Sequence, residues 1–188
     1  VVGGGFIGVE TADELNKLGK SVTLVEKLPN ILSLAFDEEF SLEAEDILKK
    51  RGLNIKTDSG IKEIKGNGKV SEVLFENGAS LKADAVILSM GYTPNSVLAK
   101  KCGLQINERG FITVDEYMRT ELDDVFAVGD CAEKKDYFTR KTASTMLAST
   151  ACTEARIAGM NLYNLSTLKT FGGTIAVYST AVGETAFS

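Results

Sequence analysis

A closely spaced set of glycines follows two valines at the start of the sequence. Gly3, Gly5 and Gly8 have the spacing G-x-G-x-x-G. Because glycine has no side chain, the first of these allows a tight turn, the second lets a ligand approach the backbone and the third allows a helix to pack closely on a strand. The unpaired N–H groups at the start of such a helix favour phosphate. The predicted pyrophosphate-binding turn comprises Gly3, Gly5, Phe6, Ile7 and Gly8.

A carboxylate follows these glycines at a meaningful distance. Glu26 lies 18 positions after Gly8, at the end of an apolar, β-branched run. An acid there can accept hydrogen bonds from both ribose hydroxyls of an adenosine and repels a 2′-phosphate, so we expect NADH to be preferred over NADPH. Lys27 leaves some tolerance for NADPH, and Glu10, one turn into the predicted helix, is a weaker candidate. The alternative interpretation is a structural glycine turn and a solvated acid at the end of a strand.

These residues need a strand, a turn, a helix and a second strand to position them. Residues 1–2 end a buried strand, apolar residues at helical spacing (Ile7, Ala12, Leu15, Leu18) predict a helix over 7–18, and 21–25 is a second strand. A helix over 38–51, with acids at its start and bases at its end, leads to a third strand at 53–56. This order predicts an α/β fold with a doubly wound, Rossmann-like sheet.

The sequence pattern changes after residue 60. Alternating residues over 61–81, interrupted by Gly66-Asn67-Gly68 and Asn77-Gly78, predict a three-stranded antiparallel meander. A continuous apolar run at 84–89 predicts a buried strand, after which the first unit closes near residue 93. Farther on we expect a buried strand at 124–128, a helix over 145–163 and a strand at 174–178. The apolar face of that helix is expected to be Leu147, Ala151, Ala155, Ala158 and Leu162.

Composition excludes several functional classes. The 188 residues include 26 acidic and 21 basic side chains, and the resulting net charge of −5 argues against nucleic acid or an anionic membrane as a partner. The longest apolar runs are too short to span a bilayer. The sequence has no histidine, so histidine-based catalysis and histidine-containing metal sites are excluded. Three cysteines without a C-x-x-C pair predict neither a disulfide framework nor a metal site, and indicate a reducing, cytoplasmic compartment.

Several segments carry a family resemblance. The runs VVGGGFIGVETADELNKLG, ADAVILSMGYTPN and TELDDVFAVGDCAE, together with Glu26, resemble the pyridine nucleotide-disulfide oxidoreductases, flavoproteins with two dinucleotide-binding domains. The runs ASTMLASTACTEARIAGMNLY and GGTIAVYSTAVGETAF are most similar to the branch that holds NADH oxidases and coenzyme A-disulfide reductases. The resemblance covers nearly the whole chain.

The resemblance implies how the chain is divided. Residues 1–93 would form the NAD(P)H-binding domain, with Gly91 beside the nicotinamide. Residues 94–165 would be the C-terminal half of an FAD-binding domain, and 166–188 would start a dimerisation domain. Gly129 and Asp130 would contact the FAD ribitol or pyrophosphate edge. The helix that begins near Ala148 would aim its N-terminus at the flavin pyrimidine carbonyl, so Leu147 and Ala148 would contact the flavin.

The resemblance also implies an activity. NADH would pass hydride to FAD, and the electrons would leave to a disulfide, a persulfide or dioxygen, in a cytoplasmic homodimer when full length. The family's first FAD-binding glycine motif and its redox-active cysteine belong to an N-terminal segment, and a sequence starting at Val1 inside a strand reads as a fragment. We therefore assign no catalytic residue, read Cys102, Cys131 and Cys152 as structural, and expect NADH binding with weak FAD retention. The alternatives are an NADH reductase of a ferredoxin- or rubredoxin-type protein acceptor, and a non-catalytic NADH-binding module.

Overall fold

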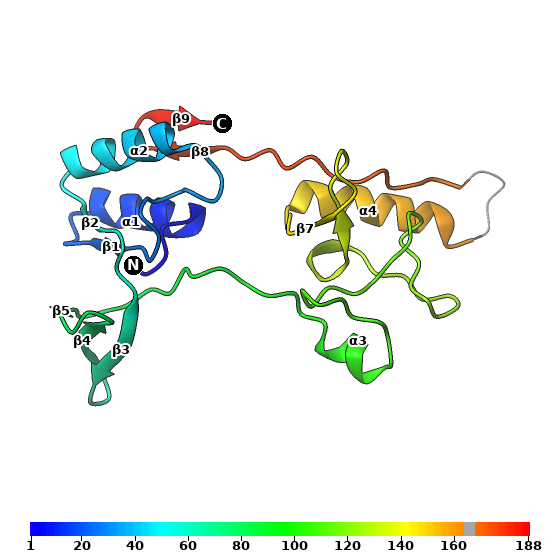
Figure 1. Ribbon diagram of the computed structural model, residues 1–188, viewed down its shortest axis with the longest axis horizontal. Coiled ribbons are helices and arrows are strands. Elements are labelled where there is room, and N and C mark those ends of the chain that lie inside the picture. The colour runs from blue at the N-terminus through cyan, green and yellow to red at the C-terminus, as the bar shows by residue number, and fades with distance from the viewer. Residues whose placement is uncertain (164–167) are drawn as a thin grey trace. The chain divides into compact units, whose positions relative to one another are not determined.

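The computed structural model describes residues 1–163 and 168–188. They form two compact units: unit 1 comprises Val1–Gly91 and Tyr178–Ser188, and unit 2 comprises Tyr92–Val177 (Figure 1). The expected boundary at 165/166 lies outside the described residues. The assignment of these units to NAD(P)H- and FAD-binding domains stays a prediction. Within the described ranges, no helix is both long enough and apolar enough to cross a bilayer.

The sheet of unit 1 is parallel. Strand β1 (Thr23–Val25) pairs with β2 (Asn54–Lys56), and Val2 forms parallel bridges with both Val25 and Leu88. The segments therefore lie side by side in the order β2, β1, Val2, Leu88. In chain order these are the third, second, first and fourth segments. This order is typical of one half of a doubly wound dinucleotide-binding sheet, and the predicted Rossmann-like fold is confirmed.

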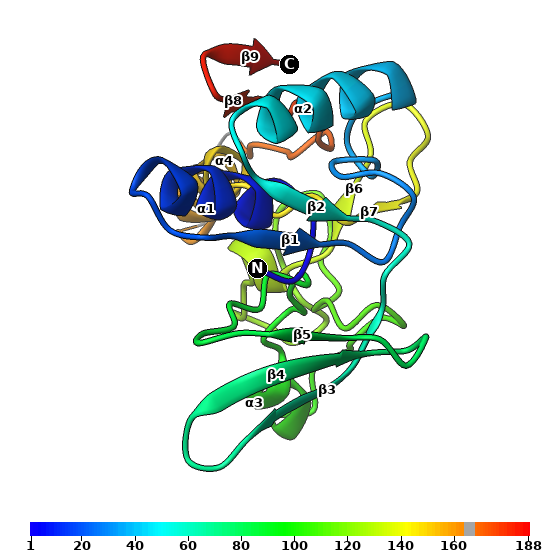
Figure 2. The same ribbon diagram turned by 90° about the vertical axis from the view of Figure 1, so that its left-hand side faces the viewer.

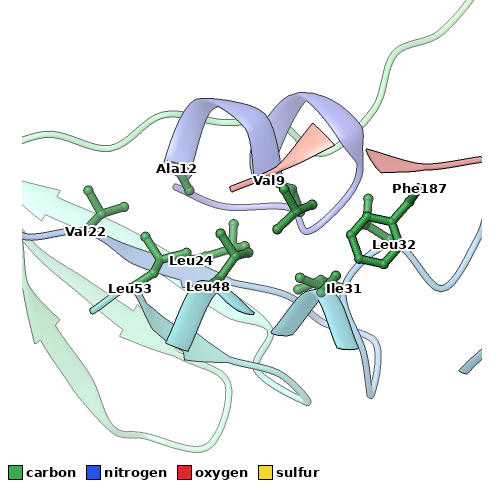
Figure 3. Close-up of a cluster of buried hydrophobic side chains, with 11 residues drawn as sticks. Val9, Ala12, Val22, Leu24, Ile31, Leu32, Leu48, Leu53 and Phe187 are labelled. Atoms are coloured by element: carbon green, nitrogen blue, oxygen red, sulfur yellow. The ribbon is translucent and has the colours of Figure 1, made fainter. Parts of the chain in front are cut away.

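Two helices cover this sheet. Helix α1 (Phe6–Lys17) packs on β1, and α2 (Glu38–Lys50) packs on β2 (Figure 2). A C-terminal hairpin of β8 (Thr180–Val182) and β9 (Thr185–Phe187) packs against both helices. Figure 3 shows the apolar core that these elements enclose: Val9, Ala12, Val22, Leu24, Ile31, Leu32, Leu48, Leu53 and Phe187.

Helix α1 begins where the glycine turn ends, as predicted, but its buried face differs from the prediction. Ile7 and Leu18, which were expected to face the core, are 59% and 73% exposed. The buried positions are Gly8, Val9, Ala12 and Asp13. Of the four expected residues Ala12 is buried and Leu15 is half-buried. Asp13 joins the buried face because a lysine and an arginine pair with it, which hydrophobic spacing alone does not reveal.

The antiparallel meander is confirmed. Strands β3 (Ile61–Gly66), β4 (Val70–Phe75) and β5 (Ser80–Lys82) pair in sequence order. Both predicted turns contain a glycine with positive φ, +71° at Gly68 and +85° at Gly78. The buried strand expected at 84–89 is wrong: this segment has a single bridge, to Val2, and Leu88 is 54% exposed. It lies at the edge of the parallel sheet, so its continuous apolar run is not covered on both faces within unit 1.

Unit 2 contains short elements around a second core. They are α3 (Val97–Lys101), the 3-10 helix η1 (Gly129–Cys131), β6 (Lys134–Lys135), β7 (Thr142–Ala143) and α4 (Ala148–Asn161). The buried core residues are Ala99, Ile112, Val114, Met118, Ala127, Ala132 and Ala158.

Two strands expected between residues 124 and 178 are wrong. The segment 124–128 has only a bridge between Phe126 and Arg119, and Ala127 is its one buried residue. At 174–178, Thr174 alone forms a bridge, to Asp136, and the following strand starts at Thr180. Both segments are rich in apolar and β-branched residues, but each forms only one β-bridge and pairs with no neighbouring strand.

Helix α4 also buries a face that differs from the expected one. Its buried residues are Thr150, Glu154, Ala158 and Asn161, while Ala155 is exposed and Leu162 lies beyond the helix and is 52% exposed. Glu154 enters the interior because it pairs with Lys134 and accepts a backbone hydrogen bond. Of the five residues expected on this face, only Ala158 is buried, and the other buried positions are polar or charged.

Candidate nucleotide-binding site

The glycine turn joins the first strand segment to α1, and two of its positions have no room for a side chain. Gly3 has a φ of +106°, and a Cβ atom there would lie 2.2 Å from the carbonyl oxygen of Ser89. A Cβ atom on Gly8 would lie 1.8 Å from the carbonyl oxygen of Gly3. Both distances are impossible contacts, so these glycines allow the turn, the helix and the edge segment to pack together.

Gly5 has the opposite environment. It is exposed, it is the N-cap of α1 in an extended conformation, and a Cβ atom there would meet nothing within 4 Å. The first helical hydrogen bond runs from the N–H of Val9 to the carbonyl of Gly5, at 2.9 Å. The N–H groups of Phe6, Ile7 and Gly8 therefore belong to the orphan donors of the first turn, at the positive end of the helix. This open cradle of donors fits a phosphate group.

The side chain of Phe6 points toward the C-terminal hairpin. Its ring stacks on Tyr178 with centroids 5.4 Å apart and meets Phe36 edge-on at 5.8 Å. Phe6 can thus serve a phosphate only through its main-chain N–H group. Glu10 also faces the hairpin, because its carboxylate accepts a 2.7 Å hydrogen bond from the Thr180 hydroxyl. Among the described residues, no hydrogen bond connects the Glu10 carboxylate to the glycine turn.

Glu26 lies at the end of β1 and connects that strand to the glycine turn. One carboxylate oxygen accepts the N–H of Gly4 at 2.5 Å, and the other accepts the N–H of Leu28 at 2.8 Å. A carboxylate has about four acceptor positions, so it can accept further donors while these two bonds are kept. The bonds fix its orientation before a ligand arrives. Such a carboxylate is suited to a pair of ribose hydroxyls.

Gly4 is a site residue that the sequence reasoning missed. A Cβ atom on Gly4 would lie 2.9 Å from the Glu26 carboxylate and 3.0 Å from Ile31. The G-x-G-x-x-G pattern treats this position as variable, whereas the carboxylate here needs both the bare Cα and the N–H. The available signal was the run of three consecutive glycines.

Lys27 and Gly91 lie at the margins of this site. The Lys27 ammonium pairs with the Glu76 carboxylate at 3.3 Å, and both side chains are exposed. Gly91 is exposed with a φ of +88°, two residues after Ser89, whose N–H donates to the Val2 carbonyl at 2.7 Å. Because the parallel segments end at the same edge, Gly91 follows the edge segment on the side where the glycine turn lies.

The predicted residues of unit 2 also lie together. Gly129 has a φ of +80° and starts η1, which carries the exposed carboxylate of Asp130. A Cβ atom on Gly129 would lie 3.8 Å from Ala151, in the first turn of α4. Leu147 is the N-cap of that helix and Ala148 its first residue. The turn and the helix N-terminus are therefore adjacent.

A buried ion pair supports this turn. Lys134 and Glu154 are both fully buried, with the ammonium 3.4 Å from a carboxylate oxygen. Glu154 accepts the Gly129 N–H at 2.7 Å, while Lys134 donates to the Gly129 and Ala132 carbonyls at 2.5 and 3.1 Å. Burial raises the pKa of Glu154 above its usual range, although the Gly129 N–H and the Lys134 charge oppose this. Sequence reasoning missed the pair because the two residues lie 20 positions apart and nothing in their spacing indicates that they meet.

The three cysteines are not paired with one another. Cys102 and Cys152 are exposed, and Cys131 is half-buried with its Sγ 3.5 Å from the Val128 carbonyl oxygen. Their structural role stays a prediction.

Comparisons with known proteins agree with this geometry. Residues 1–155 match the family model described as pyridine nucleotide-disulphide oxidoreductase. The chain is 34% identical over 189 residues to the large subunit of a nitrite reductase [NAD(P)H] from Klebsiella oxytoca, covering 98% of this chain and 20% of that protein. It is 35% identical over 162 residues to an NAD(P)H coenzyme A polysulfide/persulfide reductase from Pyrococcus horikoshii, covering 86% of this chain and 36% of that protein.

A solved structure is similar over almost the full length. The NAD-dependent persulfide reductase from A. fulgidus superposes with a TM-score of 0.92 and 32% identity, over 98% of this chain and 34% of the reductase. The chain thus spans between about a fifth and a third of these relatives. From the glycine turn, the carboxylate that holds it and the match over residues 1–155, we conclude that the chain belongs to the pyridine nucleotide-disulphide oxidoreductase family.

Proposed function

We propose that the chain forms the NAD(P)H-binding part and a portion of the flavin site of an FAD-dependent oxidoreductase. The electron acceptor would be a disulfide, a persulfide or dioxygen. One observation carries the proposal: a cradle of main-chain donors at Gly5 lies next to the fixed carboxylate of Glu26. A diphosphate joined to an adenosine ribose needs those two features at neighbouring positions.

Unit 1 would bind and orient NADH. The N–H groups of Phe6, Ile7 and Gly8, at the positive end of α1, would bind the diphosphate, and the open space at Gly5 would let it approach. Glu26 would accept the ribose hydroxyls while it keeps its bonds to Gly4 and Leu28. The bare Cα of Gly91 would leave room beside the nicotinamide ring.

Unit 2 would contribute to flavin binding. The exposed Asp130 carboxylate is an acceptor for a ribityl hydroxyl, and the N-terminus of α4 at Leu147 and Ala148 offers donors and a positive dipole end to a pyrimidine carbonyl. Gly129 keeps the turn free of a side chain. When bound, FAD would supply the chemistry, taking two electrons from NADH and giving them to the acceptor. The residues on this chain would bind and orient the two cofactors and polarise the flavin.

The finer assignments follow from the family. We propose that the intact protein is a cytoplasmic homodimer, in which residues 1–93 form the NAD(P)H domain, 94–165 part of the FAD domain and 166–188 the start of the dimerisation domain. The three free cysteines support a reducing compartment. The acceptor classes are those in the names of similar proteins, among them the polysulfide/persulfide reductase of Pyrococcus horikoshii.

Titration of the purified chain with NADH tests the central claim. We expect saturable binding that Gly5→Ala weakens about tenfold. The added methyl group would keep the phosphate away from the donors of the first turn, and one charged hydrogen bond to a phosphate contributes roughly 1.5 kcal/mol. Gly5 has a negative φ and open space, so alanine leaves the fold intact. Gly159→Ala, at an equally open position in α4, is the matched control. The proposal fails when the wild-type chain does not bind NADH, or when both alanine variants bind it equally well.

A further inference from the structure

The antiparallel meander contributes a charge to the nucleotide-binding end of unit 1. Two backbone hydrogen bonds attach the segment before β3 to the loop after β1. The N–H of Ser59 donates to the Glu26 carbonyl at 2.9 Å, and the N–H of Asp58 donates to the Leu28 carbonyl at 3.1 Å. The residue between these two acceptors is Lys27. The start of the meander is therefore fixed beside the lysine that follows the ribose-binding acid.

Glu76, in the tight turn after β4, has a defined position next to this segment. Its N–H donates to the Gly60 carbonyl at 2.9 Å, and the turn is closed by the Gly78 N–H bonding the carbonyl of buried Phe75 at 3.0 Å. The carboxylate lies over Gly60: a Cβ atom on that glycine would be 2.4 to 2.8 Å from its three carboxyl atoms. Gly60 lacks a positive φ, so the glycine provides space rather than an unusual backbone conformation.

This position brings the Glu76 carboxylate within 3.3 Å of the Lys27 ammonium. Without Glu76, an ammonium next to Glu26 would be the natural partner for a 2′-phosphate on the adenosine ribose. With Glu76, that ammonium already has an anionic partner, and the two carboxylates outnumber the one cation. A 2′-phosphate would meet net negative charge, whereas an uncharged 2′-hydroxyl would not.

We propose that Glu76 is a specificity-determining residue that disfavours NADPH by neutralising Lys27. The inference rests on the proposed function, since it concerns the adenosine end of that nucleotide site. It gives the meander a role in selecting the coenzyme, in addition to its role in the fold.

The test uses the whole chain and probes only the adenosine end. ADP-ribose and its 2′-phosphate displace bound NADH, and NADH fluorescence reports each dissociation constant at low ionic strength. The measured quantity is the ratio of the two constants, 2′-phosphate over ADP-ribose. We expect Glu76→Gln to lower this ratio by about two- to fivefold, which is the range of an exposed ion pair, and the change to shrink at high salt.

A second variant leaves every charge in place. Gly60→Ala puts a methyl group where the Glu76 carboxylate lies and forces that carboxylate to move. We expect a shift in the same direction as for Glu76→Gln. Glu63→Gln, which removes an exposed carboxylate from β3 of the same meander, is the matched control and should change the ratio less.

The Lys27→Gln background separates a local effect from a general one. If Glu76 acts through Lys27, Glu76→Gln has little effect there. The inference is overturned when the ratio is unchanged in Glu76→Gln, when Glu63→Gln changes it equally, or when the shift persists without Lys27. A wild-type chain that does not bind NADH overturns the proposed function itself, and this inference with it.

Discussion

A carboxylate is buried in a helix of each unit, and the two are stabilised in different ways. In unit 1, Asp13 of α1 is 2.9 Å from the Lys17 ammonium and 3.4 Å from the Arg51 guanidinium, and it accepts the Gly183 N–H at 3.2 Å. In unit 2, Glu154 of α4 faces one ammonium at 3.4 Å and one backbone N–H. The main contrast lies in the partners: both cations of Asp13 are about one third exposed, whereas Lys134 is fully buried.

The pKa values of the two acids shift in opposite directions. Burial would raise the pKa of Asp13, but the hydrogen bonds from Lys17 and Gly183 and the charges of Lys17 and Arg51 outweigh it and lower the pKa. For Glu154 burial dominates, and the pKa is raised. Hydrated partners lose little solvation when they pair, but a buried partner must also be desolvated. The comparison teaches that the pKa of a buried acid falls only where its hydrogen bonds and neighbouring charges together outweigh burial, and Asp13 has two cations where Glu154 has one.

The two acids also connect different parts of the fold. Asp13 joins α1 to the C-terminal hairpin through Gly183, beside the Thr180–Glu10 hydrogen bond. Glu154 accepts the N–H of Gly129, and Lys134 donates to the carbonyl of the same residue. The first carboxylate therefore stabilises a packing contact, and the second positions a turn that carries a proposed flavin contact.

Removing the buried cation should have the largest effect. Lys134→Met leaves Glu154 charged and without its cation in a dry interior, so we expect unit 2 to lose about 3–5 kcal/mol of stability. Denaturant-dependent hydrogen exchange, read over the amides of unit 2, measures it. Lys135→Met, at the exposed neighbouring position, is the control.

A double variant distinguishes loss of charge balance from loss of packing. Lys134→Met combined with Glu154→Gln removes both charges and keeps an acceptor for the Gly129 N–H. Most of the lost stability should return. If the double variant is as unstable as Lys134→Met alone, the contrast between the units is one of packing and not of charge.

Asp13→Asn should have a smaller effect. The asparagine oxygen can still accept the Gly183 N–H, and water can solvate Lys17 and Arg51 once the carboxylate is gone. We therefore expect unit 1 to lose about 1–2 kcal/mol of stability. The amides of α1 and of the β8–β9 hairpin should exchange faster. Glu14→Gln removes a more exposed carboxylate that also contacts Lys17, at 2.6 Å, and should change exchange little. Equal effects of Asp13→Asn and Lys134→Met would contradict the role given to partner hydration.

The glycine turn and the acid after β1 could be predicted from the sequence because their chemistry is local. Gly8 and Glu26 are constrained by residues within one strand–turn–helix–strand unit, whereas Gly3 is constrained by the distant Ser89. Steric exclusion at each glycine leaves a clear signal in the sequence. The hairpin turns at Gly68 and Gly78 were predictable for the same reason.

The buried faces of α1 and α4 could not be predicted because their determinants are distant. Asp13 has one local partner, Lys17, but its other partners, Arg51 and Gly183, are distant in the sequence, and Glu154 pairs with Lys134, 20 positions away. Hydrophobic spacing places a charged residue outside unless its partner is known. The same limit applies to the C-terminal hairpin, whose packing on α1 depends on contacts some 170 positions apart.

Acid pH should affect the two units in opposite directions, with smaller changes than deletion of a partner, because the carboxyl group itself remains. For Glu154 the folded pKa is raised above 4.5, so protonation favours folding: unit 2 gains stability as the pH falls through the folded pKa toward 4.5. For Asp13 the folded pKa is below 3.8, so its contribution persists down to about that pH and is lost only as the pH falls further. Hydrogen exchange corrected for intrinsic rates measures both units in one sample, and subtracting the Glu154→Gln and Asp13→Asn profiles isolates each acid. A gain in unit 2 that survives in Glu154→Gln would assign the effect to other groups and remove the electrostatic basis of the contrast.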